Sequence, residues 1–248
     1  MIRTIISCLV VTIAIAFCGG IASAQSGHHG FITVSGGIHT GGQSLSIHRE
    51  FEVNQESASY DATHPFASGV LVDGGVGFRI WKDLGAGVSV SRFTSSTPAT
   101  VEARIPHPFQ FGSLREFNGE SFGAERTETG VHVQMLYHLP LTGRLRAVVF
   151  GGPSYLMTAQ ELVSAVHYDE SYPYDTATFR SADVARATGS ALGLNAGVDA
   201  FWMFTKMFGT GGLVRFTRAS IDLDAPAGQR VAFDAGGVHA AAGLRFFF

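Results

Sequence analysis

Residues 69–80 read GVLVDGGVGFRI, and apolar side chains occupy every second position. One set of alternate positions holds valine, glycine, phenylalanine and isoleucine, whereas the other holds Asp73 and Arg79 among leucine and glycine. Successive side chains of a β-strand point to opposite faces, so this period of two predicts a strand with one apolar and one mixed face. The same period returns in residues 130–139, 191–204 and 238–248. The chain is therefore predicted to be all-β.

The composition of the two faces indicates what each one contacts. The four apolar faces together hold 24 residues without a charged side chain, whereas the 20 opposing positions hold four. In a soluble β-sandwich, which is the alternative, the face opposite the core meets water and is rich in Lys and Glu. Here that face is mostly Gly, Asn, His and isolated charges. We therefore expect it to line a crowded interior, with the apolar face turned to lipid.

Short and long connections alternate along the chain. Strands are predicted near residues 30–40, 66–80, 85–96, 127–139, 145–158, 190–204, 209–222 and 234–248. The long connections are residues 41–65, 97–126, 159–189 and 223–233. Because hydrocarbon offers no partner to backbone polar groups, a sheet can cross a bilayer only when it is closed. The pattern predicts a closed antiparallel eight-stranded transmembrane β-barrel, an up-and-down meander, with short periplasmic turns and four extracellular loops.

The first residues have the features of a secretory signal peptide. Arg3 precedes an apolar run, and Ala22 and Ala24 give the A-x-A spacing that signal peptidase accepts. A membrane anchor is the alternative, but the run is shorter than the roughly 20 residues that a spanning helix needs. We expect residues 1–24 to be removed and residues 25–248 to form the barrel domain.

Removal of the leader also removes both cysteines, Cys8 and Cys18. The exported chain would then lack disulfides and thiolate metal sites. Without Arg3 it has 16 basic residues against 20 acidic ones, a net charge of -4 that does not suggest nucleic-acid binding.

The end of the chain resembles the C-terminal signal that bacterial outer-membrane barrels present to their assembly machinery, with Gly243, Phe246 and Phe248 in the matching positions. The usual polar residue two positions before that glycine is Ala241 here. Residues 144–155, RLRAVVFGGPSY, are also similar to the fifth strand of the OmpA/OmpX-type eight-stranded barrel superfamily. The resemblance implies assembly from the periplasm and residence in the bacterial outer membrane. It implies no single activity, since related barrels serve as anchors, adhesins or enzymes.

An eight-stranded barrel is only wide enough to be filled by side chains. The inward face is predicted to hold a polar network of Asp73, Arg79, Glu128, His132, His138, Arg146, Asp199, Arg215, His239 and Arg245. These groups either fill the lumen with ion pairs and hydrogen bonds or line a narrow conductive path.

No catalytic, cofactor or metal site is predicted. His132 and His138 share a face but stand roughly 20 Å apart along a strand, too far for one ion. The chain contains no G-x-S-x-G, and alanines follow His239, so the serine of a barrel lipid hydrolase is missing there.

Two arginines break the pattern of apolar outward positions. Arg92 and Arg218 share the outward parity of their strands and lie toward the long-loop ends. We expect them to meet lipopolysaccharide phosphates at the outer leaflet, where a lipid-facing arginine costs little. A one-residue bulge that turns them inward is the alternative.

The long loops carry whatever is specific to this chain. Residues 103–111 and 168–179 combine aromatic, proline and acidic residues, a composition suited to contact with an extracellular protein or glycan. The same composition fits strand extensions that pack over the barrel mouth. The sequence thus predicts a monomeric, non-enzymatic barrel with a structural or surface-interaction role. A small passive channel is the alternative, and a lipid-modifying barrel enzyme is a third.

Overall fold

The computed structural model describes residues 29–141, 143–224 and 230–248, so the predicted leader lies outside the described part. The strands within these residues are β1 (Gly30–Thr40), β2 (Leu45–Val53), β3 (Glu56–His64), β4 (Gly69–Trp81), β5 (Leu84–His107), β6 (Gln110–Leu139), β7 (Leu145–Glu170), β8 (Ala177–Met203), β9 (Phe208–Asp224) and β10 (Arg230–Phe247). None of the described residues forms a helix long and apolar enough to cross a membrane.

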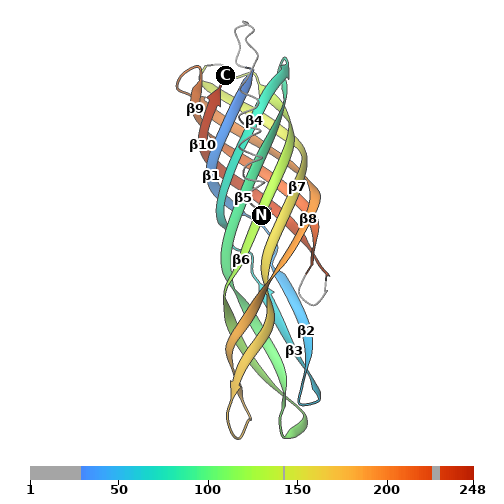
Figure 1. Cartoon of the computed structure of the whole chain (residues 1–248). Helices are drawn as coiled ribbons and strands as arrows, with labels where there is room; N and C mark the ends of the chain where they lie inside the picture. The colour runs from blue at the N-terminus through green and yellow to red at the C-terminus, as the bar shows by residue number, and fades with distance from the viewer. Residues whose placement is uncertain (1–28, 142, 225–229) are drawn as a thin grey trace, which may run out of the picture.

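Eight of these strands close into an antiparallel ring. The ring runs β1, β4, β5, β6, β7, β8, β9 and β10, and β1 pairs with β10 (Figure 1). At the seam the amide of Gly30 donates to the carbonyl of Phe248 at 3.0 Å, and the amide of Phe248 donates back at 2.9 Å. The predicted closed ring of eight strands is confirmed.

The eight ring strands follow one another in chain order as predicted, but the described sheet has ten strands, because residues 41–65 are not a simple loop. They form the hairpin β2–β3, and β3 pairs with the outer part of β5 from Ser59 opposite Arg104 to Thr63 opposite Thr100. Beyond the end of β4, the long strand β5 leaves an edge of unpaired backbone groups. The hairpin covers that edge, which satisfies those groups.

Residues 97–126 and 159–189 are also mostly strand, because β5 to β8 run 24 to 30 residues each. The alternative of strand extensions is therefore the one observed. We call the part beyond the barrel the distal extension; it comprises residues 41–65, 95–127, 158–189, 219–224 and 230–235. Figure 1 shows its β2–β3, β5–β6 and β7–β8 hairpins, twisted about one another, at the end of the molecule opposite the C-terminus.

The outside of the ring is an apolar belt. Exposed apolar side chains occur on its strands, among them Ile32, Val34, Ile38, Val70, Val72, Val76, Val88, Val133, Met135, Val149, Leu192, Leu194, Val198, Val214, Phe216 and Leu244. Val70 to Ile80 covers about 33 Å along the strand, which at a tilt of about 40° gives roughly 25 Å along the barrel axis, the height of a transmembrane barrel's apolar band. Exposed aromatic side chains gather at the short-turn end, namely Trp81, Tyr137, Trp202, Phe204, Phe208, Phe246 and Phe248.

The distal extension has an apolar core of its own. Alternate residues of β5 point into it, and Ala99, Val101 and Ile105 are fully buried. Their neighbours come from β3, β6, β7 and β8, and include Tyr60, Phe117, Val163 and Ala177. The Tyr60 hydroxyl donates to the Val163 carbonyl at 3.3 Å, which joins the β2–β3 hairpin to β7. A second core outside the belt explains why the extension is ordered structure rather than loop.

Candidate functional site

The lumen is crossed by two buried arginine–aspartate pairs. Arg245 on β10 donates from Nε and Nη2 to the two oxygens of Asp199 on β8, at 2.7 and 2.8 Å. Its Nη1 also donates to Ser35 on β1 at 2.8 Å. This bidentate geometry is the strongest form of a charge-assisted hydrogen bond, and it ties three ring strands together across the interior.

The second pair lies beside the first. Arg215 on β9 donates to Asp73 on β4 at 2.6 Å and to Ser89 on β5 at 3.0 Å, and its guanidinium lies 5.6 Å from the ring centre of Phe150. Both members of the pair are almost fully buried. The hollow lined by these two arginine–aspartate pairs has a volume of about 30 Å³, the space of about one water molecule.

A chain of neutral polar side chains continues toward the long-loop end. His132 bonds through one ring nitrogen to Ser91 at 2.9 Å and through the other to Ser154 at 2.7 Å. Asn195 donates to Ser154 at 2.8 Å and accepts from Gln134 at 3.1 Å. Four ring strands are thus linked, and these hydroxyls are buried where no external substrate reaches them.

The outer mouth of the lumen is closed by a third ion pair and by rings. Arg126 pairs with Glu128, and its guanidinium lies 5.1 Å from the ring centre of Phe66 and 4.9 Å from that of Phe233. Beneath it, the rings of His39 and His239 stand 4.5 Å apart. Further rings pack against His39, with Phe93 at 4.4 Å and Phe66 at 5.6 Å between ring centres.

The short-turn end of the lumen is aromatic. Phe247 packs 5.6 Å from Phe31 and 5.2 Å from Phe201 between ring centres, in a buried cluster with leucine and valine side chains. The lumen therefore holds an apolar floor, charged pairs in the middle and a cation–ring cap at the outer mouth.

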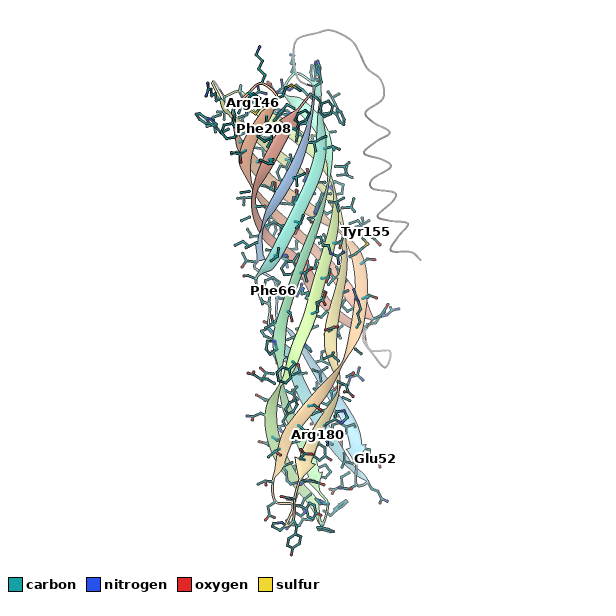
Figure 2. The ribbon with its side chains drawn as sticks, turned by 60° about the vertical axis from the view of Figure 1, so that its left-hand side comes forward. Glu52, Phe66, Arg146, Tyr155, Arg180 and Phe208 are labelled. Carbon is teal, nitrogen blue, oxygen red and sulfur yellow. The ribbon has the colours of Figure 1, made fainter. Side chains whose placement is uncertain are left out.

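The structure brings together most of the predicted lumen residues but places two elsewhere. Arg79 is exposed at the end of β4, and Arg146 is half-buried at the rim with its guanidinium 5.6 Å from the ring centre of Phe247 (Figure 2). Both stand at the short-turn ends of their strands, apart from the ion pairs of the lumen. Sequence reasoning missed Arg126, because it was counted with the loop 97–126; its place two residues before Glu128, on the same face, is the signal that could have found it. The described ion pairs of the lumen balance three arginines with three carboxylates.

At the far end, a buried arginine holds the hairpin tips together. Arg115 on β6 donates to the carbonyls of Tyr174 and Pro106, both at 2.9 Å, and pairs with Glu170 at 2.7 Å. The residues come from the β5–β6 and β7–β8 hairpins, so one guanidinium fixes one tip against the other.

The hairpin tips carry exposed aromatic rings. Phe109, Phe111 and Tyr172 are 76%, 90% and 85% exposed, and Phe109 packs edge-on against Tyr174 at 5.4 Å between ring centres. Figure 2 shows this end around the labelled Arg180 and Glu52, far from Arg146. We call Phe109, Phe111, Tyr172 and Tyr174 the aromatic tip.

The distal extension is strongly acidic. It holds 16 of the chain's 20 acidic residues and 7 of its 17 basic residues, a surplus of nine negative charges. Neutral aromatic rings at the tip therefore stand on a body whose electrostatic field attracts cations and repels anions.

The pKa values of two histidines in the extension are shifted in opposite directions. The hydrogen bond that joins His48 to Asp61 at 2.8 Å raises the pKa of His48 above its ordinary value. Burial lowers the pKa of His64 to about 4, and its neutral ring accepts a hydrogen bond from the Val163 amide at 3.4 Å. The Ser46 hydroxyl, two residues before His48, bonds to Thr63 rather than to the histidine.

Arg92 and Arg218 both lie on the outer wall. Each sits in an unbroken ladder, with Arg92 opposite Val72 and Arg218 opposite Gly236, so the alternative of a bulge at these positions is not observed. Arg218 forms an ion pair with Asp234, with 2.6 Å between its Nη2 and the Asp234 Oδ2. Arg92 has no hydrogen bond or ion pair within the described segments.

The C-terminal residues lie at the ring seam. Phe246 and Phe248 point outward at the short-turn end. A Cβ at Gly243 would come within 2.0 Å of the Val34 carbonyl, so glycine permits the close approach of β10 to β1. Recognition of these residues by the assembly machinery stays a prediction. Among the described side chains, no group of three or more His, Cys, Asp or Glu is arranged to hold a metal.

No protein-family model and no curated protein sequence matches the chain. Solved structures do. The outer membrane protein OprG from Pseudomonas aeruginosa is 10% identical over 91% of this chain and 99% of its own, with a TM-score of 0.47. Neisserial surface protein A is 12% identical over 88% and 97%, with a TM-score of 0.45. The Ail protein of Yersinia pestis, solved with the heparin analogue sucrose octasulfate, is 10% identical over 88% and 99%, with a TM-score of 0.40. The likeness is one of fold, that of bacterial outer-membrane β-barrels.

Proposed function

We propose that the protein is a non-conducting, non-enzymatic barrel of the bacterial outer membrane that presents its distal extension as an extracellular contact surface for a positively charged partner. The observation that carries this proposal is the extension itself. It has its own apolar core, a surplus of nine negative charges and an exposed aromatic tip. Exposed rings on a rigid support are the typical anchors of a protein interface.

The filled lumen supports the non-conducting part of the proposal. Opposite charges pair at each level of the middle, and the floor is packed with aromatic rings. Ions need a continuous wet path whose groups bind them weakly enough to let them leave. Arginines already held by aspartates offer no such path, which disfavours the alternative of a small passive channel.

The polar clusters give little support to catalysis. An activated serine needs a base within hydrogen-bond reach and an accessible position. The Ser–His contacts of the lumen are accessible to no substrate, because His132 and Ser154 are buried inside the ring. On the extension, His48 and His167 each pair with an aspartate, while the nearby Ser46 is bonded elsewhere.

The contact surface can be tested with a charged probe. Protein reconstituted in lipid nanodiscs is expected to bind a lysine-rich peptide with aromatic residues, and the affinity is expected to fall steeply with added salt. The triple variant Phe109→Ser, Phe111→Ser, Tyr172→Ser is expected to bind at least tenfold more weakly, since the lost anchors are exposed rings. Calorimetric titration measures both affinities.

The matched control is Phe122→Ser. Phe122 is an exposed phenylalanine of the same extension that lies on β6 outside the aromatic tip. Equal peptide binding by the tip variant and the native protein would contradict the proposal, as would binding of heparin, a polyanion, with the same affinity as the peptide.

A further inference from the structure

The outer wall carries a hollow at the level where the apolar belt meets the distal extension. Its volume is about 690 Å³, and three arginines from different strands line it: Arg92 on β5, Arg186 on β8 and Arg230 on β10. Tyr155 and Met157 lie at its belt side. Figure 2 labels Tyr155 between the short-turn end and the extension, which places the hollow near the outer headgroup region of a bilayer.

The base of the hollow follows from the strand register. One row of neighbours across the wall is Arg92, Thr129, Met157 and Ser190. The next row is Thr127, Ala159, Thr188, Asp224 and Arg230. Arginines thus stand at the two ends of a floor of small hydroxyl-bearing and apolar side chains.

The arginines of the hollow differ from three other exposed arginines of the distal half of the molecule. Arg104, Arg180 and Arg218 each have a carboxylate within 3.4 Å. Arg92 and Arg186 have no hydrogen-bond or ion-pair partner within the described residues. Arg230 stands 3.7 Å from Asp224 with both side chains about four-fifths exposed, a contact of little strength. Unpaired guanidinium groups at a headgroup level are available to phosphate oxygens.

The size of the hollow determines the class of ligand. Around the ring, β5, β8 and β10 are two to three strand spacings of about 4.8 Å apart, so one phosphate is not expected to reach all three arginines. A headgroup of more than one sugar, with more than one phosphate, spans such a distance. Its hydroxyls would meet Thr129, Ser190 and the carboxylates of Asp222 and Asp224, and its acyl chains would continue onto the apolar belt below.

We propose that this hollow binds the phosphorylated oligosaccharide headgroup of an outer-leaflet glycolipid, with Arg92, Arg186 and Arg230 as the phosphate ligands. The inference rests on the proposed membrane residence. The sequence predicts Arg92 and Arg218 as the phosphate ligands. Arg218 is paired with Asp234, and Arg186 and Arg230, which the sequence pattern did not single out, take its place in the proposed site. The acidic extension repels soluble anions, whereas acyl chains held in the bilayer bring a tethered headgroup to the wall.

The test uses the full chain folded into vesicles that contain lipopolysaccharide. Native protein is expected to retain glycolipid after extraction in detergent, as measured by mass spectrometry. The triple variant Arg92→Gln, Arg186→Gln, Arg230→Gln is expected to retain at least tenfold less. The matched control Arg104→Gln, Arg180→Gln, Arg218→Gln, which removes three paired arginines, is expected to retain the native amount.

Further arms distinguish the source of the phosphate. Dephosphorylated glycolipid is expected to be lost from native protein, and inorganic phosphate or a single-phosphate phospholipid is expected not to compete. Equal retention by the two triple variants, or full competition by inorganic phosphate, would overturn the proposal. The heat-dependent gel shift of each variant reports folding, and the single variant Arg92→Gln provides the test if the triple variant misfolds. A variant that loses glycolipid but keeps its gel shift has a folded barrel. Its loss of glycolipid then reports on the hollow and not on folding or on the aromatic tip.

Discussion

Replacing Asp73 by alanine is expected to destabilise the folded barrel by about 3–5 kcal/mol, because it leaves the Arg215 guanidinium charged and unpaired in the lumen. Arg215 is 2% exposed and would keep its hydrogen bond to Ser89 and its contact with the Phe150 ring, but no carboxylate hydrogen-bonded to it. Urea unfolding of protein in vesicles, followed by the heat-dependent gel shift, measures the change in unfolding free energy.

The matched control is Asp234→Ala, which removes the partner of an exposed arginine on the outer wall. The Arg218 side chain is 65% exposed, so the expected loss is at most about 1 kcal/mol. The double variant Asp73→Leu, Arg215→Met is expected to recover most of the stability, since it leaves no buried charge without a partner. Equal losses in Asp73→Ala and Asp234→Ala would contradict the assignment of a buried pair that seals the lumen.

Ile105→Ala is expected to destabilise the distal extension by about 2–5 kcal/mol while the ring stays closed. Ile105 is fully buried in the extension core, and deleting its side chain removes apolar contacts and leaves a cavity. The ring interior is packed by a different set of residues around Phe247 and Phe201. Separate cores open in separate steps, so amide hydrogen exchange is expected to quicken in β3 and the outer part of β5 and to stay unchanged around the ring seam.

Leu114→Ala is the control for that prediction. Leu114 belongs to the same extension but is 56% exposed, so little buried area is lost and exchange is expected to remain native. If Ile105→Ala quickened exchange equally in the extension and at the ring seam, the protein would have one cooperative core rather than two.

The ring and its faces could be predicted because both follow from a period of two. The apolar parity of residues 69–80 and 238–248 corresponds to the observed belt, and the opposite parity holds Asp73 and Arg245 in the lumen. The lipid outside favours apolar side chains at every second position, and the crowded interior favours small or paired polar side chains at the positions between. The two faces can therefore be recognised in the sequence of a single strand. The closure of the sheet follows from the lipid as well, because the backbone groups of an open edge would have no hydrogen-bond partner there.

The period of two could not predict which charged residues pair in the lumen or how far along the barrel each one lies. Alternation tells which face a side chain occupies but not how far along the barrel it lies, so the pattern groups Arg79 and Arg146 with lumen ion pairs to which neither belongs. Pairs such as Arg215 with Asp73 cross the lumen between strands that are not neighbours, and strand tilt sets which levels meet.

The distal extension was the part that the sequence pattern described least well. Its strands bury alanine more often than valine or isoleucine, so the period of two is weak in hydropathy although it is clear in burial. Polar and acidic residues on the outer face further resemble loop composition. Arg126 and the hairpin β2–β3 were missed for this reason, because both lie in segments with that composition.

The most direct test of the central claim, a ring sealed by paired charges, is the conductance of the folded protein in a planar bilayer. Purified full-length protein with a positive heat-dependent gel shift is expected to leave the bilayer's current at its baseline over a range of voltages and salt concentrations. Steady ohmic conductance that persists with the native protein and changes its ion selectivity in Arg215→Gln would contradict the sealed lumen.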